Sequence, residues 1–203
     1  VFMALGAWRL ATHQVLARRS AVIETLGGAS VLCGDKTGTL TENRMRVARL
    51  WTRDADLTVS DRGDLPDAAV SLLGMAALAS AVRPVDPMDK AIHALAEGAR
   101  PAVLEPEPRR TWPSRPESLA VVQLWKEGEG TFLAAAKGAP EAIFKLCRLD
   151  DAMLEALHGA TTAFAEAGLR VLGVASARGI GEDMAEPADV TFTFAGLIGF
   201  VDP

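Results

Sequence analysis

The chain has 203 residues, of which 49% are hydrophobic, and a formal net charge of −5. This length and composition allow one good hydrophobic core, or one domain with an appendage. No apolar run approaches the roughly 20 residues that cross a bilayer, so we expect no membrane-spanning helix in this stretch. The two cysteines, Cys33 and Cys147, lack a metal-ligand spacing and favour a reducing, cytosolic setting.

The charge is unevenly spread along the chain. Residues 1–50 carry seven Lys or Arg and three Asp or Glu, whereas residues 51–203 carry 14 and 23. A basic arm that binds nucleic acid is one interpretation, but the cations are sparse and not interleaved with aromatic residues, so we expect no nucleic-acid partner. Cytoplasmic flanks of membrane helices also collect Lys and Arg, and this accounts better for the pattern.

Hydrophobic periodicity and turn residues predict a mixed α/β chain. In the first part we expect a helix over 1–26 ended by Gly27 and Gly28, a buried strand over 29–34, a strand over 45–51, a loop over 52–65 and a helix over 66–82. In the second part we expect a helix from Asp86, a proline-rich connection over 100–118, a hairpin of strands 119–125 and 131–136, a helix from Pro140, a helix over 152–167, and strands over 169–175 and 190–201.

One carboxylate, Asp35, stands between the apolar strand over 29–34 and a turn rich in Gly and Thr. Open α/β sheets place their ligands at this end of a strand. Gly38 permits a tight turn, Thr37 offers a hydroxyl to phosphate oxygens, and Lys36 adds a positive charge. A carboxylate so placed can act as a nucleophile toward phosphorus. A solvated Asp in an ordinary strand-to-loop turn is the alternative.

Residues 35–43 read DKTGTLTEN and resemble the phosphorylation signature of P-type cation-transporting ATPases almost residue for residue. The resemblance implies that Asp35 takes the γ-phosphoryl group of ATP beside Lys36 and Thr37, and that Asp35 and Thr37 supply part of a Mg²⁺ shell. The wider haloacid-dehalogenase-like group includes phosphatases with a second Asp two positions after the nucleophile, where this chain has Thr37. Without that acid, water attack on the acyl-phosphate is slow, which suits a pump better than a free-standing phosphatase.

Two further segments carry candidate nucleotide ligands. Asp86 is suited to cap the start of a helix, Pro87 to its first position, and Asp89 to an imperfect capping box. These residues could simply start a helix that binds no ligand, which is the alternative to a nucleotide site. The family has an acid, more often Glu, that faces adenine at the position of Asp89. Trp112, with Arg109 and Arg110, combines an aromatic face with cations. The family has an adenine-stacking aromatic there, and core packing of Trp112 is the alternative.

Lys137 and Gly138 begin the sequence KGAPE, in which a strand end meets a helix that starts at Pro140. Gly138 permits close approach of the backbone, and Lys137 can direct its ammonium at a phosphate or an adenine edge; a solvated surface Lys is the alternative. KGAPE resembles the nucleotide-pocket signature of the same family, in its calcium and sodium/potassium classes.

Arg170 is the charged residue of the apolar strand over 169–175. A cation inside such a strand needs an anion, either a nucleotide phosphate, as the resemblance implies, or a nearby carboxylate.

The resemblance implies an α/β (α+β) fold and three segments. Residues 1–45 would hold a stalk helix with the first strand and phosphorylation loop of a Rossmann-like catalytic domain, and residues 46–201 a nucleotide-binding domain with an antiparallel sheet flanked by helices. Residues 202–203 would begin the hinge between them. The parent would be an ATP-driven pump at the cytoplasmic face of the cell membrane, with ATP, Mg²⁺ and a transported cation as partners. The isolated fragment would bind nucleotide without turnover. A haloacid-dehalogenase-type phosphatase and a non-catalytic nucleotide-binding module are the alternatives.

Overall fold

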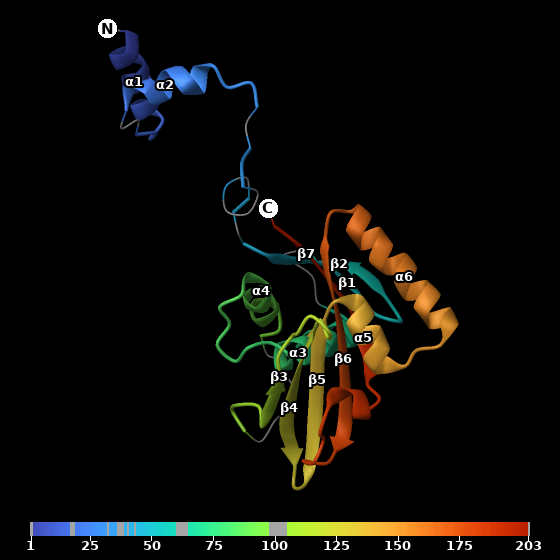
Figure 1. Ribbon diagram of the computed structural model, residues 1–203. Helices are drawn as coiled ribbons and strands as arrows, with labels where there is room; N and C mark the ends of the chain where they lie inside the picture. Colours follow the sequence, from blue (N-terminus) through green and yellow to red (C-terminus); the bar gives the residue numbers. More distant parts are fainter. Residues whose placement is uncertain are drawn as a thin grey trace. The chain divides into compact units, whose positions relative to one another are not determined.

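A computed structural model describes residues 2–16, 19–31, 33–35, 39, 41–42, 44–59, 65–97 and 105–202. The chain separates into two compact units, Val1–Leu40 and Thr41–Pro203. The first unit contains two helices, α1 (Phe2–Thr12) and α2 (Ser20–Gly27), and the sheet belongs to the second (Figure 1). The sequence had predicted a boundary five residues later, after residue 45. Among the described residues, no helix is both long and apolar enough to cross a membrane.

Two predictions for the first unit are wrong. The single helix expected over 1–26 is interrupted after Thr12, because the Thr12 hydroxyl donates to the Arg9 carbonyl at 2.6 Å and Gln14 takes a positive φ of 62°. The strand expected over 29–34 is absent from its described residues, and Val31 is 78% exposed there. An apolar run becomes a buried strand only if neighbouring strands pair with it, and no described strand does so.

The second unit is built on a seven-stranded sheet in the order β2-β1-β7-β6-β5-β4-β3. Every neighbouring pair is antiparallel. The strands are β1 (Arg46–Trp51), β2 (Asp56–Thr58), β3 (Arg110–Trp112), β4 (Ala120–Gly128), β5 (Thr131–Gly138), β6 (Arg170–Ile180) and β7 (Thr193–Val201). The helices are α3 (Asp67–Leu78), α4 (Pro87–Leu95), α5 (Pro140–Cys147), α6 (Asp151–Glu166) and the 3-10 turn η1 (Pro187–Asp189). This confirms the predicted mixed α/β fold with an antiparallel sheet flanked by helices.

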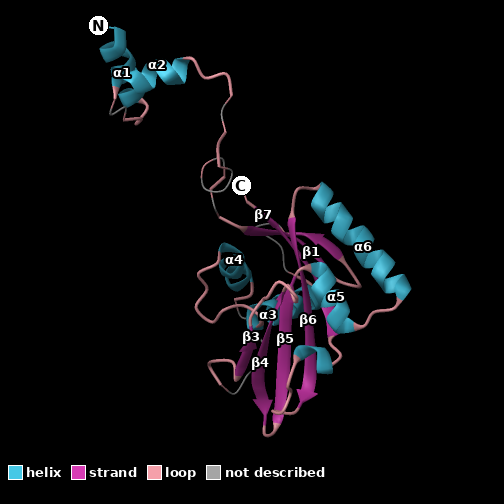
Figure 2. Cartoon of the chain, in the orientation of Figure 1, coloured by secondary structure: helices cyan, strands magenta, loops and turns pink. Residues whose placement is uncertain are grey.

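Helices cover both faces of the sheet (Figure 2). On one face, α3 and α4 pack against Trp125, Leu133 and Ala135, and the Trp125 Nε1 donates to the Leu78 carbonyl at 2.8 Å. On the other face, α5 packs against Phe132 and further side chains of β4 and β5. The centre of β5 is therefore buried on both faces, which explains why it reads as a continuous apolar run rather than an alternating one.

The short edge strands β2 and β3 were not predicted, because they fall in segments expected to be a loop and a proline-rich connection. Each has three residues, and pairing with a longer neighbour, β1 or β4, defines it. The predicted helix starts at Asp86 and Pro140 are confirmed, as is the end of α6 near Gly168, which takes a φ of +73°.

The two ends of the second unit lie side by side. Arg46 pairs with Val201 where β1 meets β7. Just outside that pair, the Thr41 hydroxyl donates to the Asp202 carboxylate at 2.6 Å, and the backbone N–H of Arg44 donates to the same carboxylate at 3.2 Å. The two end segments of this unit are thus adjacent and are tied together by Asp202.

Candidate functional site

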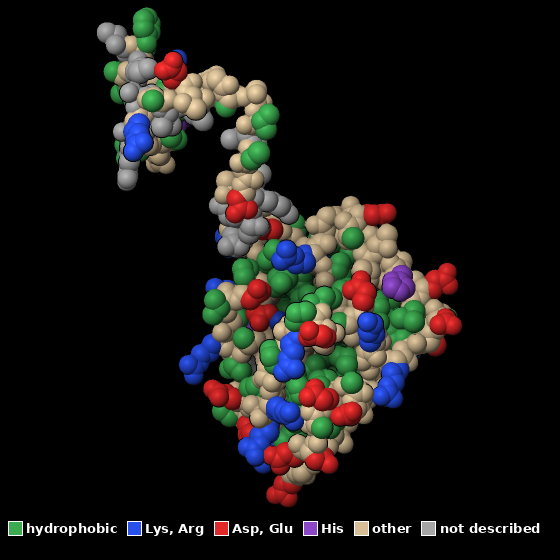
Figure 3. Space-filling model, in the orientation of Figure 1, with side chains coloured by type: hydrophobic (Ala, Val, Ile, Leu, Met, Phe, Trp, Pro, Cys, Tyr) green, Lys and Arg blue, Asp and Glu red, His purple; other side chains and the backbone are tan. Residues whose placement is uncertain are grey.

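A cleft of about 630 Å³ opens on the sheet face that α3 and α4 cover. Its wall comes from the α3–α4 connection and the start of α4, and its floor from β3, β4, β5 and the start of β6. The residues include Ala79, Ala81, Asp86, Met88, Asp89, Thr111, Leu119, Val121, Gln123, Lys137, Gly138, Pro140 and Val171. In Figure 3, apolar side chains gather between the positions of α4 and α5. A mostly apolar cleft with a few polar groups is typical of a small-molecule site.

Lys137 is the buried cation of this cleft, with 8% of its surface exposed. Its Nζ donates to the Ser80 hydroxyl at 2.9 Å and forms an ion pair with the Asp89 carboxylate. Burial lowers the pKa of the Lys137 ammonium to about 8, while the nearby Asp86 carboxylate acts in the opposite direction. Lys137 is thus a poorly solvated ammonium, for which a polyanionic ligand would be a strong partner.

Asp86 and Asp89 have different hydrogen-bond partners at the start of α4. The Asp86 carboxylate caps the helix by accepting from the backbone N–H of Met88 at 2.7 Å and of Asp89 at 3.3 Å. Asp89 does not complete the predicted capping box: one of its oxygens accepts from the Ala81 N–H at 3.1 Å, and the other pairs with Lys137. The structure therefore brings together two sequence-predicted ligands that lie 48 residues apart.

Gly138 meets the expectation of close backbone approach. A Cβ atom at this position would overlap the Leu119 carbonyl oxygen and lie 2.6 Å from the Ala120 Cα. The Leu119 carbonyl also accepts from the Ala139 N–H at 2.8 Å, where β5 passes into α5. A side chain at 138 would force this junction apart.

We therefore expect Gly138→Ala to lower the free energy of unfolding by about 1–3 kcal/mol, the usual cost of overpacking a close contact. Urea denaturation followed by circular dichroism measures this change. Gly159→Ala is a suitable control, because a Cβ there has open space and alanine favours the α6 helix. Equal stability of Gly138→Ala and wild type would contradict the close contact.

Trp112 requires a correction, because it does not line the cleft. In β3 it pairs with Val122, and both lie on the sheet face toward α5, where Trp112 is 7% exposed within an apolar cluster. The Arg110 guanidinium stacks 4.5 Å from its ring centroid. Since strand side chains alternate between faces, Thr111 reaches the cleft instead. The core-packing alternative holds, and the expected adenine stacking by Trp112 in this cleft does not.

Arg170 also differs from expectation. It is the first residue of β6, it is exposed, and it forms no ion pair with a described residue. The premise of a cation buried in an apolar strand is therefore wrong. Val171 and Leu172 line the cleft, whereas the residue that precedes them, Arg170, does not. Arg109 is paired with Glu182 at 2.7 Å and so is engaged elsewhere.

The predicted phosphorylation loop, residues 35–43, spans the boundary between the two units: Asp35 belongs to the first unit and Thr41 to the second. Asp35 is exposed and lies outside any helix or strand, whereas Lys36 and Thr37 lie outside the described residues. In the described part of the chain, no three His, Cys, Asp or Glu side chains are grouped to hold a metal ion. Asp35 offers one carboxylate, which supplies only part of the octahedral oxygen shell that Mg²⁺ requires.

Sequence reasoning missed Ser80, Thr111 and Gln123. Ser80 is fully buried, and its hydroxyl donates to the Ala76 carbonyl at 2.8 Å while accepting from Lys137. Gln123 interrupts the apolar run of residues 120–125 (AVVQLW), and this lone polar residue in a buried strand was a readable signal. Ser80 and Thr111 offered none, because only the tertiary packing brings Ser80 to Lys137 and only the sheet register brings Thr111 to the cleft.

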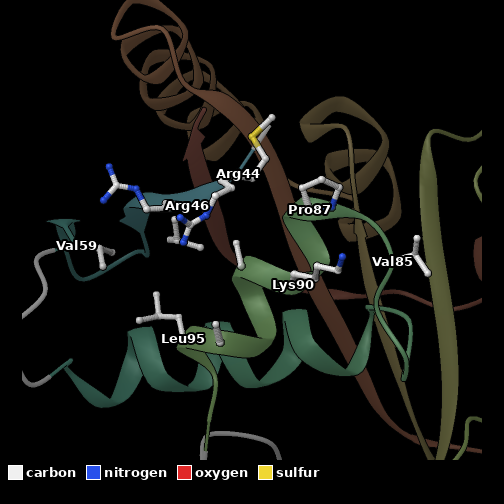
Figure 4. Close-up of a pocket in the computed structure, with 11 residues that line it drawn as sticks. Arg44, Arg46, Val59, Val85, Pro87, Lys90 and Leu95 are labelled. Carbon is white, nitrogen blue, oxygen red and sulfur yellow. The ribbon is translucent and has the colours of Figure 1, made fainter. Parts of the chain in front are cut away.

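A second cleft, of about 700 Å³, lies beside α4 and β1 and is lined by Arg44, Arg46 and Lys90 above an apolar surface. Figure 4 shows Lys90 extending its amino group away from the two arginines. Its cations are all exposed and do not converge on one point. We therefore assign the candidate site to the cleft of Lys137, where the cation is buried and held by two partners.

No protein-family model matches this chain. Two sequence signatures, DKTGTLTEN and KGAPE, and the cleft that Lys137, Gly138 and Pro140 of KGAPE line therefore point to its function.

Proposed function

We propose that the second unit is the nucleotide-binding domain of a P-type cation-transporting ATPase, and that it binds ATP in the cleft of Lys137. The observation that carries this proposal is the meeting of Lys137, from KGAPE, with Asp89, from the predicted adenine-facing segment. The seven-stranded antiparallel sheet flanked by helices agrees with the expected architecture.

The chemistry of the cleft suits a nucleotide. Its apolar side chains, such as Leu119, Val121 and Val171, offer a surface to a flat base. The chain is acidic overall, so attraction of a polyanion depends on local groups such as the Lys137 ammonium rather than on net charge. A ligand anion near Lys137 would also compensate part of the desolvation that depresses its pKa.

In the complete pump, Asp35 is the proposed nucleophile. A carboxylate oxygen of Asp35 forms a bond to the γ-phosphorus of ATP, the bond from that phosphorus to the β–γ bridging oxygen breaks, and ADP leaves. The proposal that the resulting aspartyl-phosphate drives cation transport, at the cytoplasmic face of the membrane, rests on the resemblance of residues 35–43 and KGAPE.

A nucleotide-binding module without catalysis is the second candidate. It is favoured by the separation of the chain into units, because Asp35 and Lys137 belong to different ones. A haloacid-dehalogenase-type phosphatase is less well supported, since position 37 is Thr rather than an acid. Radiolabelled ATP distinguishes the three: a stable acyl-phosphate indicates a pump, phosphate release a phosphatase, and binding alone a module.

The first test is direct binding. We expect the 203-residue chain to bind ATP weakly but measurably by calorimetry, with ADP close behind, because the proposed contacts are to the base and its neighbourhood rather than to the γ-phosphate. Inorganic triphosphate, which lacks the base and sugar, should bind much more weakly than ATP. Absence of ATP binding at millimolar concentration would refute the assignment of the cleft.

A further inference from the structure

Gln123 is a buried polar side chain in an otherwise apolar stretch of β4. Only 5% of its surface is exposed, and its Oε1 has no hydrogen-bond partner among the described residues. The Trp112 Nε1 is also buried and unpartnered, but it lies on the opposite face of the sheet. A buried acceptor without a partner costs free energy, so its presence in a binding cleft points to a ligand that satisfies it.

The sheet register aims Gln123 into the cleft. It lies between Thr111 of β3 and Ala135 of β5. Along each strand, the side chains that face the cleft alternate with those that face α5. Ala135 is too small to cover the amide. Val121 is directly opposite Lys137, so Gln123 and Lys137 are diagonal cross-strand neighbours, for which a spacing of about 7–8 Å is usual. One nucleotide can therefore approach both Gln123 and Lys137.

The carboxamide chemistry of Gln123 is selective. Its oxygen accepts hydrogen bonds, whereas its NH₂ group donates them. The adenine edge offers the complementary pair, a 6-amino donor and the N7 acceptor, and a Gln amide can bond both. A purine with a carbonyl at position 6 presents two acceptors, O6 and N7, on this edge, so it offers no donor to the Gln123 Oε1.

We infer that Gln123 is a specificity-determining residue that selects adenine in this cleft. The Gln123 Oε1 accepts a hydrogen bond from the 6-amino group, and its Nε2 donates to a ring nitrogen. This inference rests on the proposed function, because it requires that the cleft hold a nucleotide base. It adds to that proposal a residue for which neither KGAPE nor the DKTGTLTEN signature provides an indication.

The test compares ATP with purine riboside triphosphate, which is the same nucleotide without the 6-amino group. Calorimetry on the 203-residue chain should show ATP binding about tenfold more tightly, the usual effect of one hydrogen bond to an otherwise unpaired buried group. Gln123→Met keeps the length of the side chain but removes its polar atoms, and it should bind the two nucleotides within about twofold of each other. Ser176→Ala, on β6 outside the cleft lining, should keep the wild-type ratio.

The outcomes separate this inference from the proposed function. If wild type binds both nucleotides equally well, the base is not selected through its amino group, and the inference fails while nucleotide binding stands. The same conclusion follows if Gln123→Met, shown by circular dichroism to be folded, keeps the wild-type preference. If wild type binds neither nucleotide, the proposed function fails and the inference fails with it. The wild-type comparison does not depend on the folding of any variant.

Discussion

Replacement of Lys137 by alanine is expected to weaken ATP binding about tenfold or more. Loss of a charged hydrogen-bond partner typically costs about 1.5–3 kcal/mol, and 1.4 kcal/mol corresponds to a tenfold change in affinity. Lys137 is the cation that is buried in the cleft, and its removal leaves the Asp89 carboxylate unpaired to repel a polyanion. Calorimetric titration of both proteins with ATP measures the change.

Two variants make this result specific. Lys126→Ala removes the same charge from β4 at a residue that does not line the cleft, and it should bind ATP as wild type does. The double variant Lys137→Met with Asp89→Asn removes both charges of the ion pair, so it should bind ATP better than Lys137→Ala does, because the repulsion is gone. Equal ATP binding by wild type and folded Lys137→Ala would place the nucleotide elsewhere.

The lowered pKa of Lys137 gives the same prediction a pH dependence. The ammonium is protonated below its pKa of about 8 and loses its charge as the pH rises through that value. ATP favours the charged form, so affinity should be greatest below the pKa and should fall as the pH rises from about 7 to about 9. This decrease should be present in Lys126→Ala and absent from the double variant.

Replacement of Asp35 by asparagine should abolish the phosphoenzyme of the complete pump. An amide is a poor nucleophile, so no acyl-phosphate bond can form at this position. Incubation of the full-length protein with γ-labelled ATP, followed by acid quenching, should give an acid-stable and hydroxylamine-sensitive label in wild type. The label should fall below detection in Asp35→Asn.

Cys33→Ser is the matched control, because Cys33 is also exposed and lies two residues before Asp35. It should retain the label, which would show that loss in Asp35→Asn does not come from general disturbance of the segment. Asp35→Asn should still bind ATP, since the cleft belongs to the other compact unit. Normal labelling of Asp35→Asn would refute the assignment of Asp35 as the phosphorylated residue.

Local sequence rules were sufficient where the structure depends on near neighbours. Asp86 followed by Pro87 predicted the start of α4, Pro140 the start of α5, and the Gly-rich segment near residue 128 the β4–β5 hairpin. In each case a cap, a fixed proline φ or a turn residue acts within a few positions of itself. The close approach at Gly138 was also readable, because absence of a Cβ is a property of the residue alone.

Pairing between distant segments decided the rest. The apolar run over 29–34 resembles a buried strand, yet no described strand pairs with it, whereas the proline-rich segment contains β3 because β4 offers it an edge. The same register turned Trp112 toward α5 and Thr111 toward the cleft, since a strand alternates its side chains and one position separates the two faces.

The sequence by itself identified Asp35, Asp89, Lys137 and Gly138 as candidates, because short signatures carry those residue types at fixed spacing. Only the tertiary structure joined Asp89 and Ser80 to Lys137, directed Gln123 into the cleft, and separated Trp112 from it. The physical reason is that the burial of an ammonium, or of an unpaired amide oxygen, depends on which strands and helices pack together, and chain order alone does not specify that packing.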